Sequence, residues 1–266
     1  MMAQQKNAPQ NALVVDMWSD LICPWCRIGE KHFEKALAMF EHRDSLRFSL
    51  RSYRLMPGSE TMPVEQVMRD KYRFNQKEMS QGFANIEETA QGVGLHYRLA
   101  GSWAGDTMDA HRLLKFAKTV GKKQSLFNRF YSAAMSEQRC IQDHAVLREL
   151  AVAEGLAEAD IDRVLAGDEY RSEVEADEKA MKDYGGNGVP YFVINGKYSY
   201  SGAVSPAIIL SALTRAWDES NPDASGSSSG ESSGDSSGAL LAEALSESQE
   251  KAEDGIACGP DGCKLT

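Results

Sequence analysis

The segment Ala12-Leu-Val-Val-Asp-Met-Trp-Ser-Asp-Leu-Ile-Cys23-Pro-Trp-Cys26 contains the pattern from which the fold of this chain can be predicted. Its Val-rich apolar beginning predicts a buried β-strand over residues 12–18. A helical pattern then starts at Pro24 and continues to about residue 41; proline suits the first helical turn, where its missing N–H would have no partner. We therefore expect Cys23 at the N-terminal end of a helix and Cys26 one turn further along, on the same side.

The expected position of Cys23 indicates redox chemistry. A thiolate at a helix N-terminus faces unpaired N–H groups and the positive end of the helix dipole, so Cys23 should ionise more readily than a free cysteine. Cys26 is then the natural resolving thiol. The alternatives are half of a four-cysteine zinc site or two inert core cysteines, but the second C-x-x-C or His pair that zinc needs at short range is missing.

The two residues between the cysteines refine this prediction. Neither is histidine, so the stabilisation of the thiolate should be moderate and the disulfide should be a correspondingly weaker oxidant. Trp25 offers an exposed apolar face on which a substrate chain could lie, although it could also be an ordinary core tryptophan.

Composition and charge exclude several classes of function. The chain has 266 residues, 42% of them hydrophobic, and a net charge of −10 without any cluster of basic residues, so nucleic acid and anionic membranes are poor partners. The N-terminus lacks the apolar region of a signal peptide, and no stretch approaches the ~18 apolar residues of a membrane span. We therefore expect a cytoplasmic protein. Its five cysteines then argue against a framework of structural disulfides.

Hydrophobic patterns along the chain predict a split α/β core. Residues 46–54 alternate and predict a second strand, which gives a right-handed βαβ unit with parallel strands. Residues 61–184 show no strand pattern and signals for about six or seven helices, which we interpret as an inserted helical lid. Two of these signals are box-like helix starts, Asn75-x-x-Glu78 and an acidic variant, Asp106-x-x-Asp109. A hairpin follows around Asn195-Gly196, and a last helix runs from Pro206 to about residue 217.

These patterns divide the chain into six segments. They are a disordered N-terminus (1–11), the first half of a thioredoxin-like core (12–60), the helical insertion (61–186), the second half of the core (187–220), a Ser/Gly-rich linker (221–238), and a tail with a short helix and the last two cysteines (239–266).

Val189-Pro190 stands where the α/β pattern resumes. A cis bond here would leave the backbone of Val189 free to pair with an extended substrate strand. A trans proline at a strand start is commoner, but the position after a helical insertion and before a hairpin favours the cis form in a thioredoxin-like fold.

Several motifs together resemble the DsbA family of thioredoxin-fold proteins, and are nearest to its cytoplasmic FrnE-like dithiol–disulfide isomerase branch. They are Ser19-Asp-Leu-Ile-Cys-Pro-Trp-Cys26, Asp109-Ala-His-Arg-Leu-Leu114, Gly188-Val-Pro-Tyr-Phe-Val-Ile-Asn-Gly196 and Ser201-Gly-Ala203. The resemblance covers residues 12–217. It implies a thioredoxin fold with a helical insertion, Cys23 as the attacking thiol, Cys26 as the resolving thiol and a cis Pro190 beside them.

The tail carries a second pair, Cys258 and Cys263, around a Pro-Asp-Gly turn. Some members of the FrnE-like branch resemble this chain in having such a C-x4-C tail. We hypothesise a second redox dithiol that exchanges with the first pair across the linker, whose mean span is about 20 Å. A static disulfide and a metal site remain alternatives. Cys140 has the character of a bystander.

His111 and Arg112 could line a cleft between lid and core, or they could be an interior histidine and a solvated arginine. Asp20 could tune the pKa of Cys23 or start the helix turn.

The sequence thus predicts a thiol–disulfide oxidoreductase that acts on protein or small-molecule disulfides without a cofactor or a metal. Glutathione or a thioredoxin-type protein would be the reductant. One alternative is a glutathione-dependent transferase or isomerase with a small aromatic or polyketide-like substrate, although the kappa-class enzymes that the family includes carry serine where this chain has Cys23. The other is a metal-binding or chaperone module.

Overall fold

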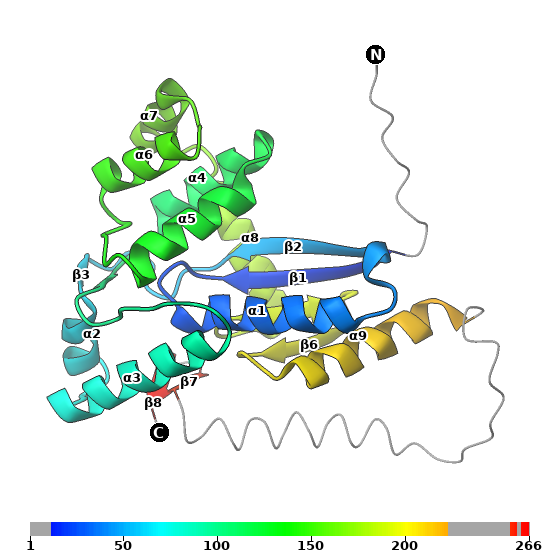
Figure 1. Cartoon of the computed structure of the whole chain (residues 1–266). Helices are drawn as coiled ribbons and strands as arrows, with labels where there is room; N and C mark the ends of the chain where they lie inside the picture. Colours follow the sequence, from blue (N-terminus) through cyan, green and yellow to red (C-terminus); the bar gives the residue numbers. More distant parts are fainter. Residues whose placement is uncertain (1–11, 223–255, 260–261, 266) are drawn as a thin grey trace.

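The computed structural model of the chain describes residues 12–222, 256–259 and 262–265 (Figure 1). The predicted disordered N-terminus, nearly all of the predicted linker and the predicted short helix after residue 238 lie outside the described residues.

The core is a four-stranded sheet with the strand order β2-β1-β5-β6. Strand β1 is parallel to β2 and antiparallel to β5, which in turn is antiparallel to β6. The strand bounds are β1 (Leu13–Ser19), β2 (Leu46–Ser52), β5 (Tyr191–Ile194) and β6 (Tyr198–Ser201). Leu13, Val15 and Met17 alternate along β1 and are fully buried, as expected of a strand with one face against a helical layer.

Helices cover both faces of this sheet (Figure 1). Helices α1 (Pro24–Met39) and α9 (Pro206–Ser220) pack together on the near face, and α8 (Arg171–Asp183) lies behind it against β2. The ring of Phe33 on α1 stacks on Phe48 of β2, with 5.0 Å between ring centroids. This arrangement is an α/β thioredoxin-like fold, as the sequence predicts.

The segment between β2 and β5 is the predicted helical insertion. The six helices that precede α8 in it are α2 (Val64–Asp70), α3 (Gln76–Gly92), α4 (Met108–Thr119), α5 (Lys123–Met135), α6 (His144–Ala153) and α7 (Glu158–Ala166). The expectation that the insertion contains no strand is wrong, because β3 (Met62–Pro63) and β4 (Trp103–Ala104) pair antiparallel. Two-residue strands are too short to produce a recognisable period.

The predicted helix-start signals have different outcomes. Asn75 forms a capping box with Glu78 at the start of α3, as predicted. The acidic box at Asp106 and Asp109 is not formed, because the N-cap position of α4 is Thr107 and Asp109 binds other side chains. Ser205 occupies the N-cap position of α9, but its side chain makes no capping hydrogen bond.

The turn between β5 and β6 has the predicted chemistry. Asn195 and Gly196 both have positive φ, at 50° and 66°, a conformation that asparagine and glycine tolerate best. In the tail, β7 (Ile256–Gly259) and β8 (Gly262–Leu265) pair antiparallel and place Cys258 opposite Cys263 in register. None of the helices in the described part of the chain is long and apolar enough to cross a membrane.

Candidate active site

Cys23 occupies the N-cap position of α1, directly before Pro24 in the first helical turn. Its backbone N–H donates to the carbonyl of Asp20 at 3.2 Å, and its own carbonyl accepts the N–H of Cys26 at 3.1 Å. The turn and the helix start therefore bring both cysteines to the same end of α1, where the partial positive charge of the helix lies. This is the location that the sequence predicts for the pair.

The second active-site segment approaches Cys23 from the start of β5. The Sγ of Cys23 donates to the carbonyl oxygen of Val189 at 3.4 Å, and the Val189–Pro190 peptide bond is cis, as predicted. Because β1 and β5 are neighbours, the end of the first strand and the beginning of the other reach the same edge of the sheet. Gly29 on α1 allows this approach, since a Cβ there would lie 3.0 Å from Cγ of Pro190.

Cys26 is fully buried behind Cys23. Burial raises the pKa of the Cys26 thiol well above its ordinary value, and the hydrogen bond and charge of Cys23 raise it further. The hydroxyl of Ser19 and the backbone of Asp20 act in the opposite direction without reversing the shift. Cys26 is therefore a neutral thiol near neutral pH, which suits a group that reacts second.

Two tyrosines of the insertion hold the first turn of α1, and the sequence gives no signal for either contact. The hydroxyl of Tyr131, on α5, donates to the carbonyl of Cys23. The hydroxyl of Tyr97, from the loop after α3, donates to the carbonyl of Pro24 at 3.1 Å. Both residues are buried aromatics, and in the sequence they are indistinguishable from ordinary core residues.

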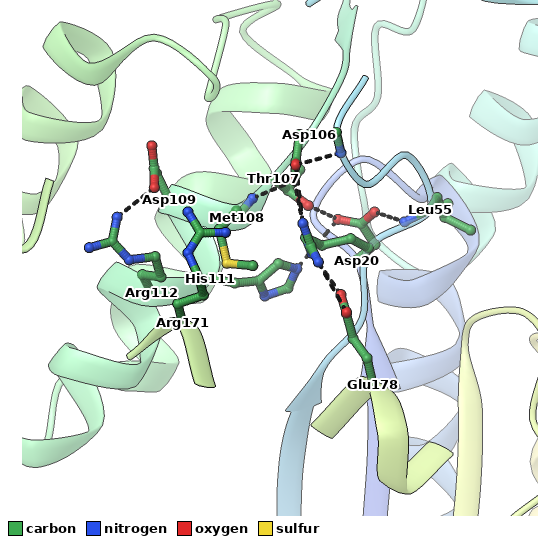
Figure 2. Close-up of polar contacts among 12 residues, drawn as sticks. Asp20, Leu55, Asp106, Thr107, Met108, Asp109, His111, Arg112, Arg171 and Glu178 are labelled. Atoms are coloured by element: carbon green, nitrogen blue, oxygen red, sulfur yellow. Dashed lines mark hydrogen bonds and ion pairs between the residues drawn. The ribbon is translucent and has the colours of Figure 1, made fainter. Parts of the chain in front are cut away.

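Asp20 links the active-site turn to two other segments (Figure 2). Its buried carboxylate accepts the N–H of Leu55 at 2.7 Å and the hydroxyl of Thr107 at 2.8 Å, and His111 Nε2 lies 3.4 Å away. Of the two roles that the sequence leaves open for Asp20, the side chain does not start the helix through a capping hydrogen bond, and tuning of the thiol stays a prediction. It fixes the turn against β2 and α4.

The neighbouring His111 and Arg112 have different surroundings (Figure 2). His111 is buried and faces Asp20. Arg112, for which the sequence allows a solvated position or one in a cleft, is buried instead: it donates to the carbonyls of Val164, Gly167 and Glu169 and to the carboxylate of Asp109. Arg112 therefore anchors the end of α7 to α4.

A largely apolar pocket lies against the active-site end of α1. Its volume is about 930 Å³, including space open to solvent, and it extends from Cys23 and Trp25 to α2, α3 and the β3–β4 pair. Trp25 is half-buried, not exposed as predicted, and lines this pocket. Among the lining residues that the structure describes, Lys71 is the only one with a charged side chain.

Three further cysteines are described, two of them by their backbone alone. Cys140 is half-buried and its Sγ contacts Gln142 Oε1 at 3.5 Å. Cys258 and Cys263 belong to the β7–β8 hairpin, for which only the backbone pairing is described. Within the described residues, no group of three or more His, Cys, Asp or Glu side chains is arranged to hold a metal ion.

A thioredoxin-like sheet, a C-x-x-C pair at a helix start and a cis proline beside it define a class: thioredoxin-fold proteins with the paired cysteines of a thiol–disulfide oxidoreductase. Within that class, residues 14–214 match the DSBA-like thioredoxin domain family. The chain belongs to this family.

Solved structures agree with this assignment. A probable DsbA oxidoreductase from Streptomyces coelicolor is 35% identical, with a TM-score of 0.75, and the match covers 96% of this chain and 99% of that one. A 2-hydroxychromene-2-carboxylate isomerase is 13% identical with a TM-score of 0.58, covering 80% of this chain and 99% of that one. The cytosolic disulfide reductase DsbM from Pseudomonas aeruginosa is 15% identical with a TM-score of 0.51, covering 79% and 98%. The last two similarities show the fold alone, and a comparison with curated proteins gives no match.

Proposed function

We propose that this chain catalyses thiol–disulfide exchange, with Cys23 as the attacking thiol and Cys26 as the resolving thiol. The observation that supports this most directly is the position of Cys23, at the start of α1 and 3.4 Å from the carbonyl of Val189. The burial of Cys26 raises the pKa of the second thiol and keeps it protonated until it is needed.

The reaction proceeds in two balanced exchanges. The Cys23 thiolate attacks one sulfur of a substrate disulfide, forms a mixed disulfide and releases the other substrate sulfur as a thiolate. Cys26 then loses its proton and attacks Cys23, which forms the Cys23–Cys26 disulfide and releases the second substrate thiolate. Two electrons pass from the dithiol to the substrate, and the reverse sequence donates a disulfide.

The finer assignment follows the resemblance to FrnE-like isomerases. In a cytoplasmic setting the thiol pool is reducing, which favours reductase or isomerase activity over disulfide donation. Trp25, Val189 and Pro190 would then contact the substrate. Glutathione or a thioredoxin-type protein would return the pair to the dithiol form.

A trapping experiment tests this proposal. Cys26→Ser removes the resolving thiol, so the variant should retain its substrate as a mixed disulfide on Cys23 that is detectable by mass. Cys23→Ser should form no such adduct and should lose disulfide reductase activity, whereas Cys140→Ser should behave like the wild type. Full reductase activity in Cys23→Ser would refute the assignment.

We further propose that Cys258 and Cys263 form a second dithiol that exchanges with the first. Their direct opposition in the β7–β8 register supports this, since the Cα atoms of such pairs lie at a separation that a disulfide can bridge. Ser/Gly-rich segments such as residues 224–238 give tethered groups a local concentration on the order of mM. A Cys258→Ser/Cys263→Ser double variant with the turnover and redox state of the wild type would exclude the exchange.

A second candidate function is that of a glutathione-dependent transferase or isomerase. The apolar pocket would then hold its small aromatic substrate. Its chemistry needs glutathione rather than a dithiol. Cys23→Ser separates the two functions, because it abolishes disulfide reduction but leaves glutathione-activated isomerisation intact.

A further inference from the structure

The apolar pocket beside Cys23 indicates which disulfides reach the nucleophile. Cys23 is 0% exposed, yet it lines this pocket together with Pro24 and Trp25. The hydroxyls of Tyr97 and Tyr131 hold the carbonyls on the same helical turn. The pocket is thus the cavity from which a small shift of lining side chains would expose the sulfur.

Two carbonyl groups with which a polypeptide strand could pair, those of Val189 and Pro190, already accept hydrogen bonds. Val189 is 1% exposed and its carbonyl accepts the thiol of Cys23. The carbonyl of Pro190 accepts the N–H of Gly202 at 2.8 Å. Any disulfide that reacts with Cys23 releases the Val189 carbonyl, but a small molecule in the pocket needs no backbone pairing with residues 189–190, whereas a peptide strand does.

The lining of the pocket selects for apolar ligands. Its side chains come mainly from the insertion, and the aliphatic and aromatic members include Val67, Met68 and Phe83. Lys71 is exposed and is the only charged residue in the described part of the lining. Glutathione carries three charged groups, so most of its charges would find no partner here.

We propose that this pocket binds a low-molecular-weight disulfide that carries an apolar group the size of an aromatic ring, and presents its sulfur to Cys23. The inference rests on the proposed exchange chemistry and specifies its substrate class. In one turnover the reduced pair and the disulfide R–S–S–R′ give the Cys23–Cys26 disulfide and the two thiols R–SH and R′–SH. The two electrons and two protons come from the enzyme dithiol.

A matched pair of dialkyl disulfides tests this selectivity. The reduced protein is mixed in single turnover with 2-hydroxyethyl 2-phenylethyl disulfide or with bis(2-hydroxyethyl) disulfide. Each rate is divided by the rate at which dithiothreitol alone reduces the same disulfide, which corrects for intrinsic reactivity. We expect the phenyl compound to react about tenfold faster, which corresponds to about 1.4 kcal/mol. Oxidised glutathione should show no such advantage.

Two variants on α2 locate the effect. Met68→Glu places a charge in the lining and should reduce the advantage of the phenyl compound to less than about twofold, by analogy with the cost of charge in apolar surroundings. Gln66→Glu adds the same charge to the same helix at an exposed residue outside the lining, and should preserve the advantage.

A binding measurement that needs no turnover distinguishes loss of the pocket from general destabilisation of Met68→Glu. The sulfur-free ligand 2-phenylethanol should slow the alkylation of Cys23 by iodoacetamide in the wild type and in Gln66→Glu, but not in Met68→Glu. Equal normalised rates for the two disulfides, or no protection by 2-phenylethanol, would overturn the inference about the pocket. Failure to reduce either disulfide while Cys26→Ser still traps protein substrates would also overturn the inference, whereas absence of any mixed disulfide in Cys26→Ser would refute the proposed function itself.

Discussion

Alkaline pH should destabilise the reduced protein relative to a variant that lacks the Cys26 thiol. The folded pKa of Cys26 is raised by burial, whereas in the unfolded chain the thiol ionises near its free value of about 8.5. Above that pH the unfolded state binds fewer protons than the folded state, so the free energy of unfolding falls as the pH rises. Below it, both states keep the proton and the stabilisation is complete.

The size of the effect follows from this linkage. One pH unit above the unfolded pKa, at pH 9.5, a thiol that stays protonated in the folded state loses about 1.4 kcal/mol of stability. Lys123 acts in the opposite direction, because burial and the charge of Lys115 lower its pKa to about 8. Between pH 8 and the unfolded lysine pKa of about 10.4, its earlier deprotonation in the folded state increases stability. In the wild type alone, the pH dependence of the unfolding free energy would therefore conceal the contribution of the Cys26 thiol.

The assay is urea unfolding of the reduced wild type and of Cys26→Ala at pH 7.5 and 9.5. The lysine contributes equally to both proteins, so the difference in unfolding free energy should decrease by about 1.4 kcal/mol between the two pH values. Oxidation of the wild type to the Cys23–Cys26 disulfide should remove the same pH-dependent component. A difference that stays constant with pH would refute the reasoning that burial keeps Cys26 neutral.

Three further substitutions probe the contacts around the site. Tyr131→Phe removes the donor to the Cys23 carbonyl; it should lower the unfolding free energy in urea by about 1 kcal/mol and accelerate alkylation of Cys23. Asp20→Asn replaces a charged acceptor by a neutral amide and should cost about 1.5–3 kcal/mol in the same assay, more than Thr107→Val, which removes a single hydroxyl. Arg112→Met leaves buried carbonyls of the α7 end unpaired and should cost at least about 3 kcal/mol, measured by thermal and urea unfolding.

Each of these expectations has a clear contrary result. Unchanged alkylation of Tyr131→Phe would mean that the hydroxyl does not restrain the helix start. An Asp20→Asn protein as stable as the wild type would show that the carboxylate does not fix the turn. For Arg112→Met, wild-type stability would mean that solvent or rearranged backbone satisfies the carbonyls.

Local sequence was sufficient to predict the elements that carry the sulfurs. A Val-rich strand, a short turn and a proline at the first helical position are neighbours in the chain, so Cys23 and Cys26 could be placed at the start of α1. The hairpin was predictable for the same reason, since Asn195-Gly196 determines its own backbone conformation.

Contacts that depend on how distant helices dock could not be predicted. Tyr97 and Tyr131 lie 73 and 108 residues from the α1 residues that they contact, and nothing in an apolar stripe shows which of its aromatic hydroxyls will meet a carbonyl of α1. The half-burial of Trp25 lies between the two interpretations that the sequence allowed, because the residues that line the pocket with it come mainly from the distant insertion. The burial of Arg112 could not be predicted, because most of its partners are backbone carbonyls. Every residue has such a carbonyl, so the sequence does not show which ones an arginine will contact.

The pairing of β1 with β5 also determines when during folding the cysteines become protected. Trp18 pairs with Tyr191, so the whole helical insertion must be spanned before these two strands join. Contacts between residues so distant in sequence form late, because closing a long loop costs entropy before any contact is gained. Helix α1 and the β1–β2 pair are local and can form earlier. A refolding chain should therefore regain helical circular dichroism before its thiols resist alkylation, and a newly synthesised chain would carry an unshielded dithiol until its last core strands are in place.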